Sequence, residues 1–153
     1  MITIEIKNDQ ITAALARISA ALADQTPVMQ DFGEYLIKST KERFSAGTAP
    51  DGSVWAAKSP VTIARYPGST KPLIGESKSL SSQIFYEAFP DRVEWGSPMI
   101  YAAMQQFGGS KSAFPNLWGD IPARPFLGLS EEDEVNLVEI AGEWLESAAA
   151  GGA

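Results

Sequence analysis

The sequence predicts an α+β fold in which a small antiparallel sheet packs with several helices in a single domain. Segments with helical spacing of apolar residues occur without strict alternation with strand-like segments, and one short turn joins two strand-like segments. The chain has 153 residues, of which 44% are hydrophobic, which suits one domain with a buried core. We place this domain at residues 1–147 and expect the small-residue segment 148–153 to be a flexible C-terminal tail.

The N-terminal third predicts one strand and two helices. Residues 2–6 alternate isoleucine with polar residues, as a half-buried strand does. Apolar residues then recur at helical spacing over residues 11–22. Thr26-Pro27 has the pattern of a cap followed by a first helical residue, and Gly47 ends the second helix. We expect these two helices to form an antiparallel pair.

The middle of the chain predicts a short helix, a loop and a hairpin. Ser59-Pro60 is again typical of a helix start. Residues 66–79 are rich in Pro, Gly, Ser and Lys, which indicates a flexible loop. Two strands are predicted at residues 80–89 and 92–95, with Pro90-Asp91 as the turn between them.

Two further helices are predicted in the last third. Ser97-Pro98 starts the first and Gly108-Gly109 stops it, followed by a loop over residues 109–120. Ser130 caps the last helix, and residues 131–133 are acidic. Negative charge in a first turn is stabilised by the helix dipole.

Residues 121–128, with the sequence IPARPFLG, form the most distinctive segment, here called the arm. Its two prolines fix a stiff, extended backbone that lacks two hydrogen-bond donors, so the arm is not a central strand. We expect Arg124 to project outward and to meet another surface, while Phe126 and Leu127 anchor the arm to the core. In the alternative interpretation the arm is a bent edge strand and its apolar residues simply fill the core.

The composition argues against most catalytic chemistry. The chain has no cysteine and no histidine, which removes disulfides, thiolate nucleophiles, Cys/His zinc sites and histidine acid–base chemistry. A Ser-Lys pair at Lys78-Ser79 stays open but lies in a loop. Helix capping explains the carboxylates at 131–133, and a local turn explains Asp51. We therefore expect no enzyme, no catalytic or metal site and no cofactor.

Charge and hydropathy argue against nucleic-acid wrapping and membrane insertion. The net charge is −7, whereas phosphate binding requires clustered Lys and Arg. Lys38, Lys41 and Arg43 share one helix end beside Phe44, but the helix dipole favours cations there. No apolar run approaches the roughly 18 residues of a membrane span, and the N-terminus does not have a signal-peptide pattern.

Large aromatic residues lie in the predicted loops, where they serve either as anchors on the core or as anchors at an interface. They are Trp55, Tyr66, Phe114 and Trp118. Together with the lack of a catalytic motif, they favour a structural or assembly role.

An ordered series of short motifs runs along the chain. The series comprises Arg43-Phe44, Pro50-Asp51-Gly52, Trp55, Thr62, Leu80, Val93, Gly96-Ser97, Tyr101-Ala102, Gln106-Phe107-Gly108-Gly109, the arm, and the acidic helix start after Ser130. This series resembles the phage virion morphogenesis, or tail-completion, family of Mu-like and P2-like phages. The resemblance covers residues 1–147. The chain departs from the family at residues 73–80, where a Thr-Gly-x-Leu turn is altered.

The resemblance implies a non-enzymatic virion protein at the head–tail junction, the neck, needed for tail completion and head–tail joining. Its implied partners are other copies of itself in a ring, often sixfold, and the phage connector or portal-side and tail-tube proteins. DNA would pass through the lumen without sequence-specific binding, and an acidic lumen would let it pass without sticking. The implied locations are the virion and, during assembly, the host cytoplasm. The alternative is a small prophage-encoded interaction adaptor without a virion role.

A ring requires two different complementary surfaces on each subunit. We expect the arm to supply one and an acidic helix face the other, with Arg124 paired to a carboxylate of its own chain or of a neighbour. The residues expected at subunit or partner contacts are Arg124, Pro122, Pro125, Asp51, Trp55, Trp118 and Phe114. The expected structural anchors are Phe126, Leu127, Tyr101 and Phe44.

Overall fold

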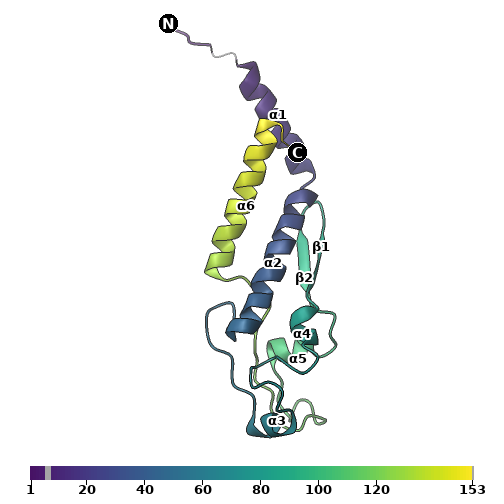
Figure 1. The fold of residues 1–153 in the computed structure, drawn as a ribbon. Coiled ribbons are helices and arrows are strands. Elements are labelled where there is room, and N and C mark those ends of the chain that lie inside the picture. The colour runs from purple at the N-terminus through teal and green to yellow at the C-terminus, as the bar shows by residue number, and fades with distance from the viewer. Residues whose placement is uncertain (6–7, 153) are drawn as a thin grey trace.

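Three long helices determine the shape of the molecule. The computed structural model describes residues 1–5 and 8–152. Helix α1 (Asp9–Ala23) leads into α2 (Thr26–Ala46), and the two follow one another along the length of the molecule (Figure 1). Helix α6 (Glu131–Ala150) lies against both of them and runs in the opposite direction (Figure 1).

The predicted antiparallel pairing of the first two helices is wrong. Helix α1 packs against α6, and its half-buried positions include the small residues Ala14 and Ala21. Small side chains allow a close approach of two helices, so the C-terminal helix takes the position that we expected α2 to take. The predicted strand at residues 2–6 is also not observed: residues 1–5 have no regular secondary structure, and Ile6 lies outside the described residues.

A two-stranded antiparallel hairpin packs against α2, which confirms the α+β class. Strands β1 (Phe85–Ala88) and β2 (Val93–Gly96) pair with Phe85 opposite Gly96 and Ala88 opposite Val93. The first strand is shorter than the sequence indicated. Residues 79–82 form a helical turn instead, which buries Leu80 in the core.

Three short helices complete the fold at the end of the molecule opposite α1 (Figure 1). They are α3 (Pro60–Arg65), α4 (Ser79–Ser82) and α5 (Ala102–Phe107). The last of these begins later than the predicted start at Ser97-Pro98.

Local signals in the sequence explain most helix ends. The Ser59 side chain accepts a hydrogen bond from the Thr62 amide, as an N-cap does. Gly47 ends α2 with a φ of 75°, a conformation that glycine adopts without steric cost. Helix α6 begins with a capping box and continues to Ala150, beyond the predicted domain boundary at residue 147.

The core lies around the C-terminal half of α2. Phe44 makes an edge-on contact with Trp55, with ring centroids 5.6 Å apart, and a tilted contact with Phe126 at 5.4 Å. Such aromatic pairs stabilise a core by more than their buried area alone. The other buried members of this core are Ala49, Leu80, Ile84 and Ala102.

The loop at residues 66–79 is tied to the body of the protein. The Lys58 ammonium donates to the Ser69 and Ile74 carbonyl oxygens at 2.7 and 2.6 Å. Leu73 and Ile74 also pack against the core. This segment therefore has a fixed attachment that its composition does not reveal.

Candidate assembly site

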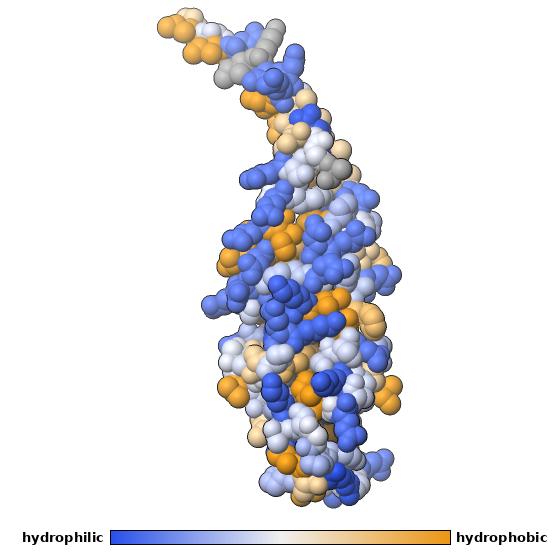
Figure 2. Space-filling view, in the orientation of Figure 1, coloured by the Kyte–Doolittle hydropathy of each residue, from blue (hydrophilic) through white to orange (hydrophobic). Residues whose placement is uncertain are grey.

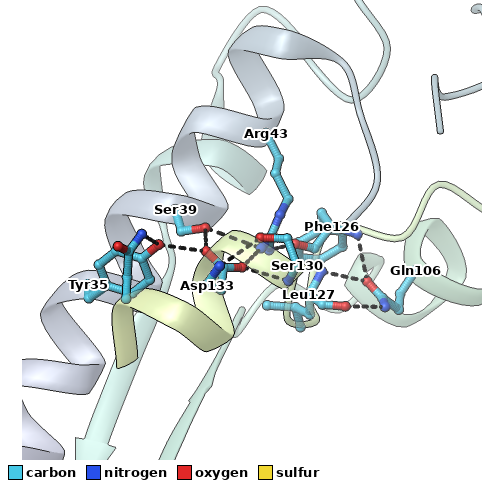
Figure 3. Close-up of polar contacts among 9 residues, drawn as sticks. Tyr35, Ser39, Arg43, Gln106, Phe126, Leu127, Ser130 and Asp133 are labelled. Carbon is cyan, nitrogen blue, oxygen red and sulfur yellow. Dashed lines mark hydrogen bonds and ion pairs between the residues drawn. The ribbon is translucent and has the colours of Figure 1, made fainter. Parts of the chain in front are cut away.

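A buried ion pair joins α2 to the start of α6 (Figure 3). The guanidinium of Arg43 contacts the Asp133 carboxylate through Nη2 and Oδ2. The other carboxylate oxygen of Asp133 accepts hydrogen bonds from the Tyr35 hydroxyl at 2.9 Å and the Ser39 hydroxyl at 2.6 Å. Asp133 is only 2% exposed, so the charge is compensated by direct contacts rather than by bulk water.

Burial and hydrogen bonding act on the Asp133 carboxyl in opposite directions. Burial raises its pKa, but donors from Ser130, Ser39 and Tyr35 and the charge of Arg43 together lower the pKa below its ordinary value of 3.8. Burial and the adjacent Asp133 carboxylate raise the pKa of the Tyr35 phenol. Asp133 is therefore ionised at neutral pH, and Tyr35 keeps its proton as a donor.

The same two side chains connect the arm to both helices. Arg43 donates through Nη1 to the Phe126 carbonyl oxygen at 3.0 Å. Asp133 accepts from the Ser130 amide at 2.9 Å, and its own amide donates to the Ser130 hydroxyl at 3.0 Å. One ion pair thus fixes the end of the arm, the cap of α6 and the last turn of α2 relative to one another.

Gln106 of α5 holds the arm from the other side (Figure 3). Its carbonyl oxygen accepts from the Phe126 and Leu127 amides at 2.9 and 3.0 Å. Its amide nitrogen donates to the Leu127 carbonyl oxygen at 2.9 Å. A side-chain amide can satisfy a strand-like backbone in this way, and the arm consequently needs no neighbouring strand at this point.

The structure corrects the expected orientation of Arg124. Its side chain does not project outward but is 8% exposed. The guanidinium donates to the Ala56 and Ala57 carbonyl oxygens at 2.7 and 2.8 Å, and not to a carboxylate of its own chain among the described residues. Burial lowers the pKa of Arg124. Its observed contacts connect the arm to the loop after Trp55.

Trp55 also meets the arm inside the molecule. Its indole nitrogen donates to the Pro125 carbonyl oxygen at 2.8 Å, and the ring is buried. Phe44 and Phe126 are buried beside it, whereas Leu127 is half-buried against the core. Of the expected interface residues, Trp55 therefore occupies a position of the anchoring kind.

The other expected contact residues are more accessible. Trp118 is 79% exposed and lies under the Arg65 guanidinium, 4.2 Å from the ring centroid. Phe114 and Pro122 are exposed, whereas Pro125 is half-buried. Asp51 is exposed too, and hydrogen bonds from Ser53 lower its pKa.

Tyr101, which we expected to anchor the core, is 39% exposed. It lies instead at a groove of about 1080 Å³ between α3, the 66–79 loop and the arm. Arm residues Pro122 and Arg124 line the same groove.

Large apolar side chains remain exposed over the surface. On α1, Ile11, Leu15 and Leu22 recur at helical spacing and are all exposed. Figure 2 shows hydrophobic side chains on one face of the molecule, interspersed with hydrophilic ones. Exposed apolar residues aligned on one helix are typical of surfaces that meet other proteins.

The polar contacts of Arg43, Asp133 and Gln106 hold the arm, α2, α5 and α6 together, and we call this cluster the joint. Within residues 1–5 and 8–152 there is no group of three or more acidic residues that could hold a metal ion. In the same ranges, no helix has both the length and the hydropathy to cross a bilayer. The buried side chains of Arg43, Arg124 and Asp133 bond to one another or to main chain, so they hold segments together and leave the exposed surfaces to make contacts.

Sequence reasoning missed the Arg43–Asp133 pair and the role of Gln106. It had assigned Arg43 to the helix dipole and Asp133 to capping, and 90 residues separate the two. The available signal was their presence in one motif series: Arg43-Phe44, Gln106, the arm and the acidic helix start all meet at this joint.

Comparison with known proteins relates the chain to phage proteins. The model of the "Phage virion morphogenesis family" matches residues 6–146. The "Mu-like prophage FluMu G protein 2" of Haemophilus influenzae is 31% identical over 140 residues, covering 91% of this chain and 92% of that protein. The "Putative capsid assembly protein G" of Escherichia phage Mu is 31% identical over 142 residues, covering 84% of this chain and 88% of that protein. No solved structure matches.

Proposed function

Because the chain belongs to the phage virion morphogenesis family, we propose that it is a structural protein of the head–tail junction, where it completes the tail and joins it to the head. It acts by assembling into a ring of identical subunits and by docking on connector or portal-side proteins and on tail-tube proteins. It meets these partners in the host cytoplasm during assembly and stays in the virion. DNA passes through the lumen of the ring without sequence-specific binding.

The observation that supports this proposal is the division between a fixed interior and exposed apolar surfaces. The joint at Arg43 and Asp133 fixes the arm and α6 to α2. The exposed surface keeps many large apolar side chains, including Trp118 and the stripe on α1. A rigid subunit that presents such surfaces loses little conformational entropy on assembly, which favours stable association.

The test is a phage in which this coding sequence is deleted and supplied again from a plasmid. We expect the deletion to yield separate heads and tails, visible by negative-stain electron microscopy, and the plasmid to restore joined particles. Normal particles without the protein would refute the proposed function and would favour the adaptor alternative.

Labelling provides a second measurement on the same particles. Gold or antibody label directed at the protein in complemented virions should lie at the neck. Label on the capsid surface or at the distal tail tip would contradict the proposed location.

A further inference from the structure

Three lysines surround a hollow at the C-terminal end of α2. The hollow has a volume of about 650 Å³, and Lys41, Lys71 and Lys78 line it together with one carboxylate, Glu76. All three lysines are exposed, and none forms an ion pair with another described residue. In a chain with a net charge of −7, this local excess of positive charge attracts an anionic partner.

The floor and wall of the hollow are partly apolar and shaped by an unusual backbone. Phe44 and Ile74 line it beside the lysines. Lys78 has a φ of 52°, in the left-handed region that residues other than glycine seldom adopt. Strained backbone of this kind persists where the surrounding structure holds it, and here Lys58 fixes the same loop through the Ile74 carbonyl.

The same molecule has a surface of matching chemistry on α6. Glu132, Glu139, Glu143 and Glu146 recur at spacings of seven, four and three residues, so they form one face of the helix. All four are exposed, and residues 131–150 contain no lysine or arginine. Val135 is exposed at the edge of the same face, between Glu132 and Glu139 in the sequence. The face is about 21 Å long at 1.5 Å per residue.

We propose that the lysine hollow of one protomer receives the Glu132–Glu146 face of helix α6 from a second copy of this chain. The proposal rests on the ring assembly of the proposed function and identifies its subunit contact. Complementary charged patches of this kind steer two partners together and fix their register. Arg124, which we first expected to pair with the acidic face, already has its acceptors inside the protomer.

The positions of the two surfaces suit a ring rather than a closed pair. Helix α6 lies on one side of α2, and α4, which follows Lys78 directly, lies on the other (Figure 1). A contact between two different patches leaves one of each kind free on both partners. Such heterologous contacts repeat from copy to copy and close into a ring when the rotation between copies allows it.

Charge reversal provides the test, with mass measured by light scattering after size exclusion at low salt. One variant carries Lys41→Glu and Lys71→Glu, and the other carries Glu139→Lys and Glu143→Lys. Each variant alone opposes like charges at the contact, so we expect self-association to weaken by about tenfold or more. An equimolar mixture restores opposite charges at both types of contact, and we expect assembly to recover in mixed particles.

The matched control is Lys38→Glu with Lys111→Glu, which changes the net charge equally but lies outside the residues that line the hollow. It should assemble like the wild type, and circular dichroism should show that all variants are folded. Folded variants that remain monomeric when mixed would overturn the proposal, as would a wild type that stays monomeric at high concentration. The proposal would also be overturned if either charge-reversal variant alone had the same particle mass as the wild type.

Two further readouts separate competing outcomes. Binding of a short DNA duplex that is lost in the Lys41→Glu, Lys71→Glu variant, without recovery on mixing, would overturn the proposal and assign the hollow to phosphate. The deletion phage tests the proposed function independently. If the protein lies at the neck but its charge-reversal variants still assemble, only this contact is refuted.

Discussion

At the scale of single residues, the stability of the joint depends on a charge pair that is shielded from water. Arg43 and Asp133 are both buried, and Tyr35 and Ser39 complete the shell of the carboxylate. A pair of this kind contributes little compared with apolar residues of equal size, but removing one partner leaves an uncompensated buried charge. The consequence is a strong dependence on each partner separately.

The first prediction concerns Arg43→Met. The side chain keeps its approximate volume but leaves the Asp133 carboxylate without a cation and the Phe126 carbonyl without a donor. We expect the free energy of unfolding to fall by about 3–5 kcal/mol, measured by urea denaturation. Lys38→Met on the exposed side of the same helix should cost less than about 0.5 kcal/mol. Similar losses for the two variants would contradict the role of the ion pair.

The second prediction concerns pH. The pKa of Asp133 is lower in the folded protein than its ordinary value of 3.8, so the unfolded chain binds more protons between those two values and stability rises with pH there. The contribution is fully present well above pH 4 and is lost as the pH falls through the folded pKa. Ser39→Ala removes one donor to the ionised form, and should cost about 1.5–3 kcal/mol at pH 7.

This cost should shrink as the pH is lowered, because the protonated carboxyl gains less from the Ser39 hydroxyl. Urea denaturation of the wild type and the variant at pH values from 7 to 2 measures the difference. Ser45→Ala, exposed on the same helix, is the control and should show little change at any pH. A Ser39→Ala cost that is constant across this range would show that the hydroxyl does not act through the Asp133 charge.

At the scale of elements, local chemistry was predictable and long-range pairing was not. The caps at Ser59 and Ser130 and the stop at Gly47 are properties of a few neighbouring residues, and each was recognised in the sequence. Residues 80–84 belong to the strand predicted at 80–89, although apolar and polar residues alternate imperfectly there. Tertiary packing of Leu80 and Ile84 into the core decided the outcome.

The candidate site shows the same limit in another form. The acceptors of Arg124 are the main-chain carbonyls of Ala56 and Ala57. Every residue has a carbonyl, so no side-chain pattern marks the partner, and an arginine between two prolines looked free. The prolines predict a stiff arm, but the surface that Arg124 of the arm contacts is set by residues 67 and 68 positions away in the sequence.

The third prediction compares two glycines within helices. Gly33 is buried on α2, and a methyl group there would overlap the Tyr86 ring of β1. Gly142 on α6 is exposed, and a methyl group would meet nothing within 4 Å. Alanine favours helix by about 1 kcal/mol at both positions, so only the overlap separates them.

We expect Gly33→Ala to lower the free energy of unfolding by about 1–3 kcal/mol and Gly142→Ala to raise it by about 0.5–1 kcal/mol. Thermal and urea denaturation measure both changes. The double variant Gly33→Ala, Tyr86→Ala should cost less than the sum of its single changes, since the overlap is absent. Strictly additive costs would mean that the hairpin does not contact α2 at Gly33.

At the scale of the whole molecule, the net charge is −7, but the positive and negative charges are unevenly distributed. Negative charge is concentrated on α6, and positive charge surrounds the hollow at Lys41, Lys71 and Lys78. Joining these surfaces between copies covers the lysines together with the glutamates of α6, so the assembled particle keeps its acidic net charge and loses this exposed basic patch. An acidic channel repels phosphate and lets DNA move without sticking, which links the proposed contact to the proposed passage of DNA.

The fourth prediction follows from this uneven charge distribution and concerns the dependence of assembly on salt concentration. Salt screens the attraction between exposed charges beyond the Debye length, which is about 10 Å at 0.1 M salt and about 3 Å at 1 M. Burial of apolar surface is not weakened in this way and is strengthened by salts such as sulfate. We therefore expect the assembled fraction, measured by sedimentation velocity, to fall between 0.05 and 0.5 M sodium chloride. Assembly that is unchanged or enhanced by salt would assign the contact to apolar residues such as those exposed on α1, in place of the lysine hollow and the acidic face of α6.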